Sequence, residues 1–338
     1  MPNLSYSISK IAQELGISKA TVSLILNGKA SKARISSAVE HQVLDFCKKI
    51  NYVPNIHAQR INREFSGTFG FLVKQRLTQD SDSPFTDMNI SGILRGITLE
   101  AQRRGCRVAI QLFNDNGDEE KVFEWLRSRE IDGLICYGID MPISWRKVFE
   151  NEGHCVVGIS AKPAKGVSSV NIDNFSVSEK VTQMLIDSGR KRFIYISGIE
   201  KSYVAEERKK GFLSALNKNG IEIKEENIIT ADFSEQKSEE LLLRLKPEAD
   251  AIICANDNMA FGTIKALEKL KIKVPLQTAV VGGDNIALCE YTSPRLTSFD
   301  NMCCEMGTEA VKVIDDMLHK GGYYNKTIKS KIIIREST

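Results

Sequence analysis

The segment from residue 7 to residue 27 constrains the chain most, because its apolar residues predict two short amphipathic helices around one glycine. Ser7 is placed to cap a first helix, whose apolar residues recur at helical spacing as far as Leu15. Gly16 permits the sharp turn that ends this helix, and Ser18 is placed to cap the second. The pattern predicts a helix-turn-helix unit, whose second helix enters the major groove of DNA with its N-terminal residues foremost.

Any two amphipathic helices around a glycine give this pattern, so the residues that follow are needed to favour DNA binding. An amphipathic segment from 36 to 50 predicts a third helix. Its apolar residues are expected to complete a three-helix core, and they are Val39, Val43, Leu44, Phe46 and Cys47. Residues 1–65 hold nine Lys and Arg against four Asp and Glu, a net charge of +5, whereas the remainder holds 37 against 39, a net of −2. A basic head on a near-neutral body places the contact with a polyanion at the N-terminus.

This N-terminal part resembles the headpiece of the LacI/GalR (lactose repressor-like) family of bacterial transcription factors. The matching residues are A-x-x-x-G-I-S-x-A-T-V-S-x-x-L-N-G, then N-Y-x-P-N, then A-Q-R-I where the family has its hinge helix. The resemblance implies a DNA-binding domain at 1–50 and a hinge helix or linker at 51–65. The DNA contacts that it implies come from Ser7, Ser18, Lys19, Ala20, Thr21, Ser23, Leu24, Asn27, Tyr52, Asn55, Ala58 and Ile61.

Within the second helix the resemblance implies two different roles. Lys19 and Ala20 occupy the positions that read base edges, where Lys donates to guanine and Ala touches a thymine methyl group. Thr21, Ser23 and Asn27 are expected to hold phosphates and so to fix position without reading sequence.

The hinge segment from 56 to 62 is too short to be a stable helix by itself. We therefore expect it to order against its twin in a dimer bound to DNA. Ile61 stands at the family's wedge position, where an apolar side chain enters between base pairs in the minor groove. A plain linker with an incidental Ile is the alternative.

From residue 68 onward, short apolar runs alternate with amphipathic segments, which predicts parallel βαβ units in two doubly wound halves. The resemblance continues through I-D-N, A-N-D, V-V-G-G-D and S-P-x-L-T-S, and it implies a two-lobed, periplasmic-binding-protein-like core. By that analogy, residues 66–165 and 296–320 form the N-terminal lobe, and residues 166–293 and 325–338 form the C-terminal lobe.

The candidate effector site follows from the rule that ligands of open α/β sheets bind beyond the carboxyl ends of the strands. Asp284 and Asn256 each end a predicted strand, and Arg208 has a planar fork that suits a bidentate contact. The resemblance adds Phe233 as an aromatic platform for a sugar ring and Phe85 as an aromatic that caps the cleft. Such a set suits a small, polyhydroxylated ligand.

Two of these interpretations have structural alternatives. Asp284 could be only a turn residue, and Phe233 could be core packing. We expect Asp257 to cap its own helix. Gly283 departs from the family, which more often has an aromatic residue before the Asp, so the sequence predicts that one wall of the cleft is missing.

The chain shows no motif for a metal or cofactor, so we expect neither. Its eight cysteines have no paired spacing and lie mostly in apolar runs, which is typical of reduced cytoplasmic thiols. Oxidant sensing or metal binding at Cys303 and Cys304 is the alternative. Four scattered histidines offer no zinc spacing. Because neither a signal peptide nor a long apolar span occurs, we expect a cytoplasmic protein that does not bind membranes.

Two other classes of protein share this fold pattern. An α/β enzyme is disfavoured because no dinucleotide-binding, P-loop, nucleophile-elbow or zinc-protease motif appears. An extracytoplasmic sugar-binding protein is disfavoured by the N-terminal unit, although a sugar-binding module without a transcriptional role stays open. We expect a transcription regulator, most often a repressor in this family, that binds double-stranded operator DNA and a sugar-like effector. Because no leucine heptads follow the core, we expect a homodimer.

Overall fold

The computed structural model describes residues 6–53, 65–74, 87–113, 119–246 and 248–338. The chain divides into two compact units, which are described separately: the headpiece, Met1–Ser66, and the core, Gly67–Thr338. None of the helices in these described ranges has the length and apolar character needed to span a lipid bilayer.

The described part of the headpiece contains three helices, α1 (Ile8–Glu14), α2 (Lys19–Leu26) and α3 (Ser37–Lys49). Buried residues of these helices, with Ala30 from the segment between α2 and α3, form one small core, which consists of Ile11, Ala12, Val22, Ile25, Ala30, Val43 and Cys47. The three predicted helices are confirmed. Leu44 was expected in this core and is not, because its side chain lies on the outer face of α3 and is 44% exposed.

The first lobe of the core is built on a six-stranded sheet with the order β11-β5-β4-β3-β1-β2. All of its pairings are parallel. The strands are β1 (Thr68–Lys74), β2 (Arg107–Phe113), β3 (Gly133–Tyr137), β4 (Val156–Ile159), β5 (Ser168–Ile172) and β11 (Asn325–Ile328). The helices are α5 (Met88–Arg103), α6 (Glu119–Arg127), α7 (Ile143–Glu152) and α12 (Cys303–Lys320).

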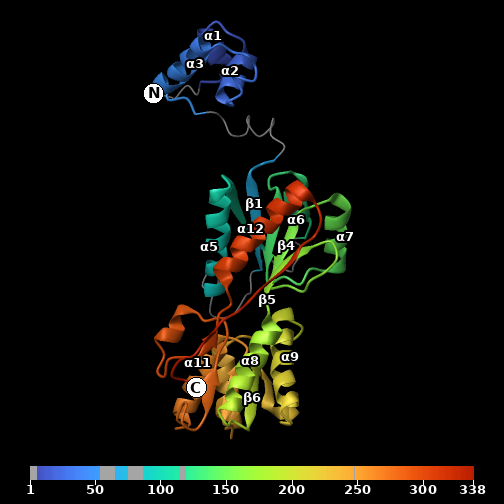
Figure 1. The fold of residues 1–338 in the computed structure, drawn as a ribbon, viewed down its shortest axis with the longest axis vertical. Helices are drawn as coiled ribbons and strands as arrows, with labels where there is room; N and C mark the ends of the chain where they lie inside the picture. The colour runs from blue at the N-terminus through green and yellow to red at the C-terminus, as the bar shows by residue number, and fades with distance from the viewer. Residues whose placement is uncertain (1–5, 54–64, 75–86, 114–118, 247) are drawn as a thin grey trace. The chain divides into compact units, whose positions relative to one another are not determined.

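The apolar residues of this sheet serve two separate cores. Alternate residues of β1 point to opposite faces, as the pleat of a strand requires. Phe71 and Val73 join the core beneath α5 and α12, whereas Leu72 joins the core of α6 and α7, which contains Trp145 and Phe149. Because both faces are covered, β1 is buried from Thr68 to Val73 and has no charged residue in that stretch (Figure 1).

The second lobe is built on a smaller parallel sheet with the order β7-β6-β8-β9. Its strands are β6 (Phe193–Ser197), β7 (Ile228–Thr230), β8 (Ala251–Cys254) and β9 (Ala279–Val281). Two helix pairs pack together, α8 (Asn174–Asp187) with α9 (Tyr203–Lys218), and α10 (Glu235–Leu245) with α11 (Asp257–Lys269). The short strands β10 (Ser298–Phe299) and β12 (Ile332–Ile333) pair antiparallel near the C-terminus, and 3-10 helices span Glu225–Asn227 and Ala287–Glu290.

Strand pairing corrects the expected lobe boundaries at two places. β5 and β11 were assigned to the C-terminal lobe, yet β5 pairs with β4 and β11 pairs with β5 in the first sheet. Residues 296–299 were assigned to the N-terminal lobe, but Thr297 bridges Val281 of β9. The chain therefore crosses between the lobes after β5, at 300–302 and again after β11. A predicted helix or strand does not reveal its sheet, because that depends on pairing with distant strands.

Candidate functional site

The two predicted helix caps in the headpiece are confirmed. Ser18 Oγ accepts a hydrogen bond from the Thr21 backbone N–H at 3.0 Å, and the two side-chain oxygens lie 2.8 Å apart. Ser7 Oγ accepts from the Lys10 N–H at 3.3 Å. Gly16 has a φ of +66°, a left-handed conformation that suits glycine and makes the turn between the helices.

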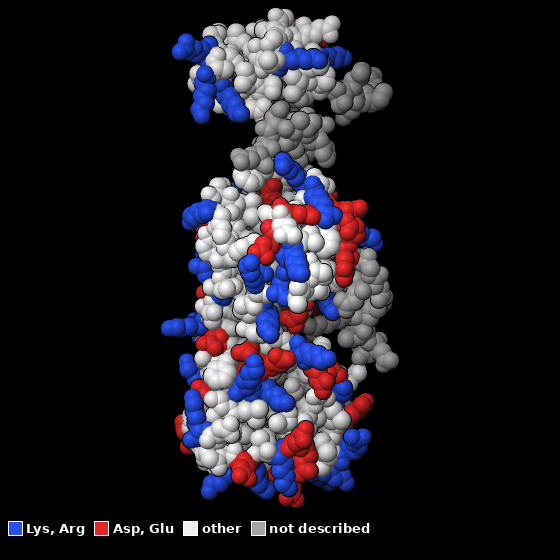
Figure 2. Space-filling view, turned by 90° about the vertical axis from the view of Figure 1, so that its right-hand side faces the viewer, with Lys and Arg blue, Asp and Glu red and all other residues white. Residues whose placement is uncertain are grey.

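The N-terminal turn of α2 is open to solvent. Ser18, Lys19 and Ala20 are exposed, whereas Val22 and Ile25, on the opposite side of the helix, are buried. The helix N-terminus carries a partial positive charge, which adds to Lys19 and favours contact with a polyanion. On the face drawn in Figure 2, the headpiece shows Lys and Arg side chains with almost no Asp or Glu.

The remaining headpiece residues fall into three groups. Thr21, Ser23 and Leu24 are half-buried beside the exposed turn. Asn27 Nδ2 donates to the Ser23 backbone carbonyl at 2.8 Å, so it closes the end of α2. The half-buried Tyr52 packs against the three-helix core. Asn55, Ala58 and Ile61, together with the cleft residue Phe85, lie outside the described residues.

In the core, the predicted effector residues Arg208 and Asp284 lie together. Arg208 Nη1 donates to Asp284 Oδ1 at 3.0 Å, and the two side chains are only 2% and 8% exposed. Asp284 follows β9, and Arg208 lies on α9, 76 residues earlier in the chain. The sheet therefore brings these two residues together at the carboxyl ends of its strands, as predicted.

Arg208 is not the free ligand-binding fork that the sequence suggested. Its Nε donates to Asn174 Oδ1 at 2.8 Å, Nη1 also donates to the Ala255 carbonyl, and Nη2 donates to Asn301 Oδ1 at 3.3 Å. Since a guanidinium has five N–H donors, one remains. The carbon of the guanidinium lies 4.7 Å from the centre of the Phe299 ring, a cation–π contact. Arg208 thus uses most of its N–H donors to hold neighbouring protein groups, including Asp284, in place.

The same ring explains Gly283. A Cβ built at Gly283 would lie 2.4 Å from the Phe299 ring, so only glycine leaves room for it. An aromatic ring from β10 therefore fills the space next to Gly283, the position at which the sequence predicts a missing cleft wall.

Asp284 links the two lobes through Asn89, in the first turn of α5. Asn89 Nδ2 donates to Asp284 Oδ2 at 2.9 Å, and Asn89 Oδ1 accepts from Asn301 Nδ2 at 3.3 Å. Burial raises the pKa of the Asp284 carboxyl, and Arg208 opposes that shift. The backbone φ of Asp284 is +112°, a strained value for a residue with a side chain, which costs about 1–3 kcal/mol. Such strain is typical of functional positions and argues against an ordinary turn.

Sequence reasoning missed Asn89, Asn174 and Asn301. Their hydrogen bonds with Arg208, Asp284 and each other join residues 34 to 212 positions apart, so no spacing in the sequence connects them. The sequence analysis also assigned the cap of α11 to the wrong one of two neighbouring residues. Asn256, not Asp257, caps α11, because Asn256 Oδ1 accepts from the Met259 N–H at 3.0 Å.

Phe233 lies where a platform is needed, at the end of the second sheet. Its half-buried ring covers Gly198, just after β6, and a Cβ at Gly198 would lie 2.1 Å from it. This position fits the predicted platform and the packing alternative equally.

Cys303 lies beside the Arg208–Asp284 cluster, at the start of α12. Its Sγ donates to Asn89 Oδ1 at 3.1 Å. Burial, followed by the charges of Asp284, Asp87 and Asp300, raises the pKa of this thiol well above its ordinary value. A thiol held in its protonated form is a poor metal ligand and a poor target for oxidants, so this environment disfavours oxidant sensing or metal binding at Cys303.

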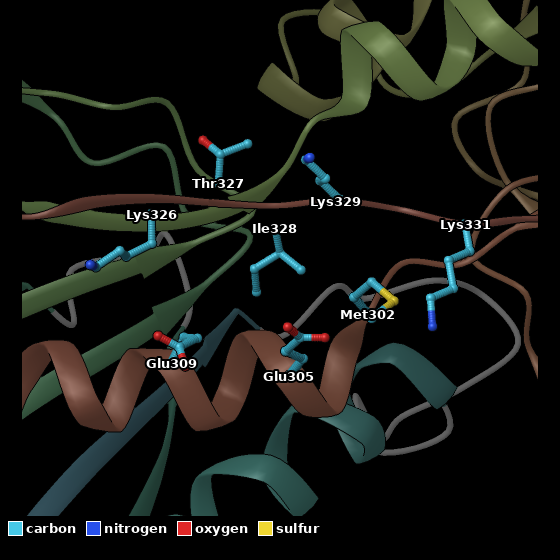
Figure 3. Close-up of a pocket in the computed structure, with 8 residues that line it drawn as sticks. All are labelled: Met302, Glu305, Glu309, Lys326, Thr327, Ile328, Lys329 and Lys331. Carbon is cyan, nitrogen blue, oxygen red and sulfur yellow. The ribbon is translucent and has the colours of Figure 1, made fainter.

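A separate groove of about 470 Å³ lies between α12 and residues 326–331. Figure 3 shows Glu305 and Glu309 on the helix, facing the strand that carries Ile328 and Lys326. Of the predicted effector residues that the structure describes, none lines this groove.

Two family models match the chain. The model of the lacI family of bacterial regulatory proteins matches residues 7–55, and that of the periplasmic binding protein-like domain matches residues 182–338. Among curated relatives, the NTD biosynthesis operon regulator NtdR of Bacillus subtilis is 27% identical and covers 98% of this chain and 99% of its own length. The transcriptional repressor CytR of Escherichia coli is 27% identical, with coverage of 98% and 96%.

Two solved structures share the fold. The lac repressor dimer bound to operator and the anti-inducer ONPF has a TM-score of 0.85 at 19% identity, and 98% of each chain is covered. The complex of the transcriptional regulator CelR with cellobiose has a TM-score of 0.73 at 24% identity, and it covers 98% of this chain and all of its own. Since the residues matched by the first family model include both capped helices and the glycine turn, residues 7–55 form a DNA-binding domain of the lacI family of bacterial regulatory proteins, and the chain is similar over almost its whole length to the transcriptional regulators NtdR and CytR.

Proposed function

We propose that the protein is a repressor that reads operator DNA with the N-terminal turn of α2 and responds to a small, sugar-like effector bound beside Asp284. The observation that carries the DNA-reading role is the capped α2, which presents Lys19 and Ala20 to solvent while Val22 and Ile25 anchor it to the headpiece. Lys19 reads a guanine, Ala20 contacts a thymine methyl group, and Thr21, Ser23 and Asn27 contact phosphates.

Replacing Lys19 by Ala tests this role. We expect Lys19→Ala to change preference at one base pair by about 1–3 kcal/mol, because the hydrogen bonds to one base are lost. Gel shifts with a library of operator variants measure the change. Lys48→Ala is the matched control, since this exposed lysine lies near the end of α3 and is expected to leave sequence preference unchanged. Equal weakening of Lys19→Ala on every sequence would contradict base reading.

The effector role rests on the polar cluster between the lobes. Asp284 accepts one hydrogen bond at each oxygen, which leaves lone pairs for ligand hydroxyl groups. Asn256 uses Oδ1 as a cap and keeps its Nδ2 group for a ligand. Phe233 and Phe85 supply the aromatic contacts, and Arg208 holds Asp284 in place. Because a related structure contains cellobiose, a sugar is the class of ligand that we favour.

Calorimetry with a panel of mono- and disaccharides that includes cellobiose and ribose tests this site. We expect Asp284→Ala to lose binding of the sugar that the wild-type protein binds, while operator binding without sugar is kept. In the wild type, the sugar should change operator affinity roughly 5- to 150-fold, the usual size of such coupling. Undiminished sugar affinity in Asp284→Ala would mean that the effector binds elsewhere.

A homodimer is the assembly that we favour, with Ile61 of the hinge as the minor-groove wedge. β2 is an edge strand of the first sheet, and its side chains Ile110 and Leu112 are 44% and 38% exposed. An exposed apolar edge strand is a common place for a second copy of the chain to bind. The related lac repressor structure is also a dimer on its operator.

A further inference from the structure

Asp257 is a buried carboxylate that the effector site does not use directly. It is the first residue of α11 and is 1% exposed. Asn256 caps the helix, so the Asp257 side chain is released from that role. None of the ion pairs among the described residues includes Asp257. Burial, with the nearby charge of Asp284, raises the pKa of its carboxyl. A carboxyl group in such an environment is stable only if hydrogen bonds replace those that it loses from water.

Its hydrogen bonds to Gly283, Ile286 and Ser298 lead to the loop that presents Asp284, and its carboxylate also accepts a hydrogen bond from the Cys289 thiol, just after this loop. The Asp257 backbone N–H donates to the Gly283 carbonyl at 2.7 Å. Its Oδ2 accepts from the Ile286 N–H at 2.9 Å, and its Oδ1 accepts from Ser298 Oγ at 2.6 Å. Ser298 Oγ in turn accepts from the Asn285 N–H at 3.0 Å. Asp257 thus fixes the residues on both sides of Asp284.

The loop requires this support because its backbone is unfavourable by itself. Asp284 and Asn285 have φ values of +112° and +52°. The backbone also passes unusually close to the carboxylate, since a Cβ at Gly282 would lie 2.2 Å from Asp257 Oδ1. Strained residues persist only where surrounding contacts determine their conformation.

We propose that Asp257 is a positioning residue for the effector, which rests on the function proposed above. It does not touch the ligand. It holds the loop from Gly282 to Ile286 so that the Asp284 carboxylate points toward Arg208 and Asn89 and is already oriented when the effector arrives. A site whose groups are oriented in advance binds more tightly, because less order is lost on binding.

Two substitutions of Asp257 separate positioning from mere stability. Asp257→Ala removes the side-chain hydrogen bonds, and we expect the affinity for the sugar found in the panel to fall about tenfold or more. Asp257→Asn keeps the two that reach the loop, because its amide oxygen accepts from Ile286 N–H and its amide NH₂ donates to Ser298 Oγ. Its affinity should stay close to that of the wild type.

Asp250 provides a matched control at the other end of β8. Its carboxylate accepts from the backbone N–H groups of Lys191 and Arg192 at 3.2 and 3.0 Å, so it also secures a loop. Asp250→Ala should lower stability without changing sugar affinity. Should Asp257→Ala fail to fold, Ser298→Ala removes the two hydrogen bonds that connect Asp257 with Asn285 but keeps the one between Asp257 and Ile286, and it should weaken sugar binding a few-fold.

Calorimetry on the full-length chain distinguishes the outcomes. If Asp284→Ala loses sugar binding while Asp257→Ala binds like the wild type, the positioning role is overturned and the effector site stands. An Asp257→Asn variant as weak as Asp257→Ala, or an equal loss in Asp250→Ala, also overturns it. If the wild type binds no sugar in the panel, or if Asp284→Ala binds normally, the proposed effector function fails and the positioning role fails with it.

Discussion

The headpiece and the core build their candidate sites in opposite ways. In the headpiece, the polar side chains bond within three or four residues, as Ser18 does with Thr21 and Asn27 with Ser23. In the core, Asp284 bonds to groups 76 and 195 residues away. A local site is fixed by a single helix and its caps. The core site exists only when both lobes are folded, so its chemistry and its stability should be difficult to separate.

The largest expected effect comes from breaking the core site at Arg208. Arg208→Met keeps much of the side-chain volume but leaves the buried Asp284 carboxylate without its cation and the Ala255 carbonyl without this donor. Removing one partner of a buried ion pair costs about 3–5 kcal/mol. We expect the free energy of unfolding of the core to fall by that amount, while the headpiece is unaffected.

Urea denaturation followed by tryptophan fluorescence measures this loss, because both tryptophans, Trp125 and Trp145, lie in the core. Arg192→Met is a suitable control, since Arg192 forms an exposed pair with Asp250 and should cost at most about 1 kcal/mol. An unchanged midpoint for Arg208→Met would show that the Arg208–Asp284 pair does not stabilise the core.

The contrast also explains what the sequence could predict. The three headpiece helices and their caps at Ser7 and Ser18 follow from local spacing, and the structure confirms them. The long apolar strands of the core were equally readable. The strand β11, with the sequence N-K-T-I, was missed because only Ile328 is buried and the others are exposed at the sheet edge. Its lysine is typical of an edge strand rather than of an apolar run.

In the core site, the sequence located the strand ends but not the bonds between them. It named Asp284 and Arg208, since each follows a recognisable strand or motif. It could not show that Arg208 already donates hydrogen bonds to Asn174 and Asn301, because these bonds depend on how α8 and the crossover at 300–302 pack against α9. The wrong assignment of the α11 cap to Asp257 has the same origin. Asn and Asp both cap helices, and only the packing of the loop at Asp284 decides which of the two residues does so.

The smallest expected effect comes from the local site, at the cap of the recognition helix. Ser18→Ala removes the acceptor for the Thr21 N–H, a loss that typically costs about 1 kcal/mol. The headpiece should be destabilised by that amount while the urea midpoint of the core, followed by tryptophan fluorescence, stays unchanged. The temperature at which the full-length chain loses operator binding measures the stability of the headpiece.

Ser36 sharpens this test, since it stands at the N-cap of α3 in the same headpiece but forms no side-chain cap bond. Ser36→Ala should therefore leave both units unchanged. If Ser18→Ala and Ser36→Ala destabilise the headpiece equally, the hydrogen bond between Ser18 and Thr21 adds nothing to the stability of the headpiece. If Ser18→Ala shifts the core midpoint as well, the two units are energetically coupled. In that case the headpiece site, like the core site, would depend on contacts between residues that are distant in the sequence.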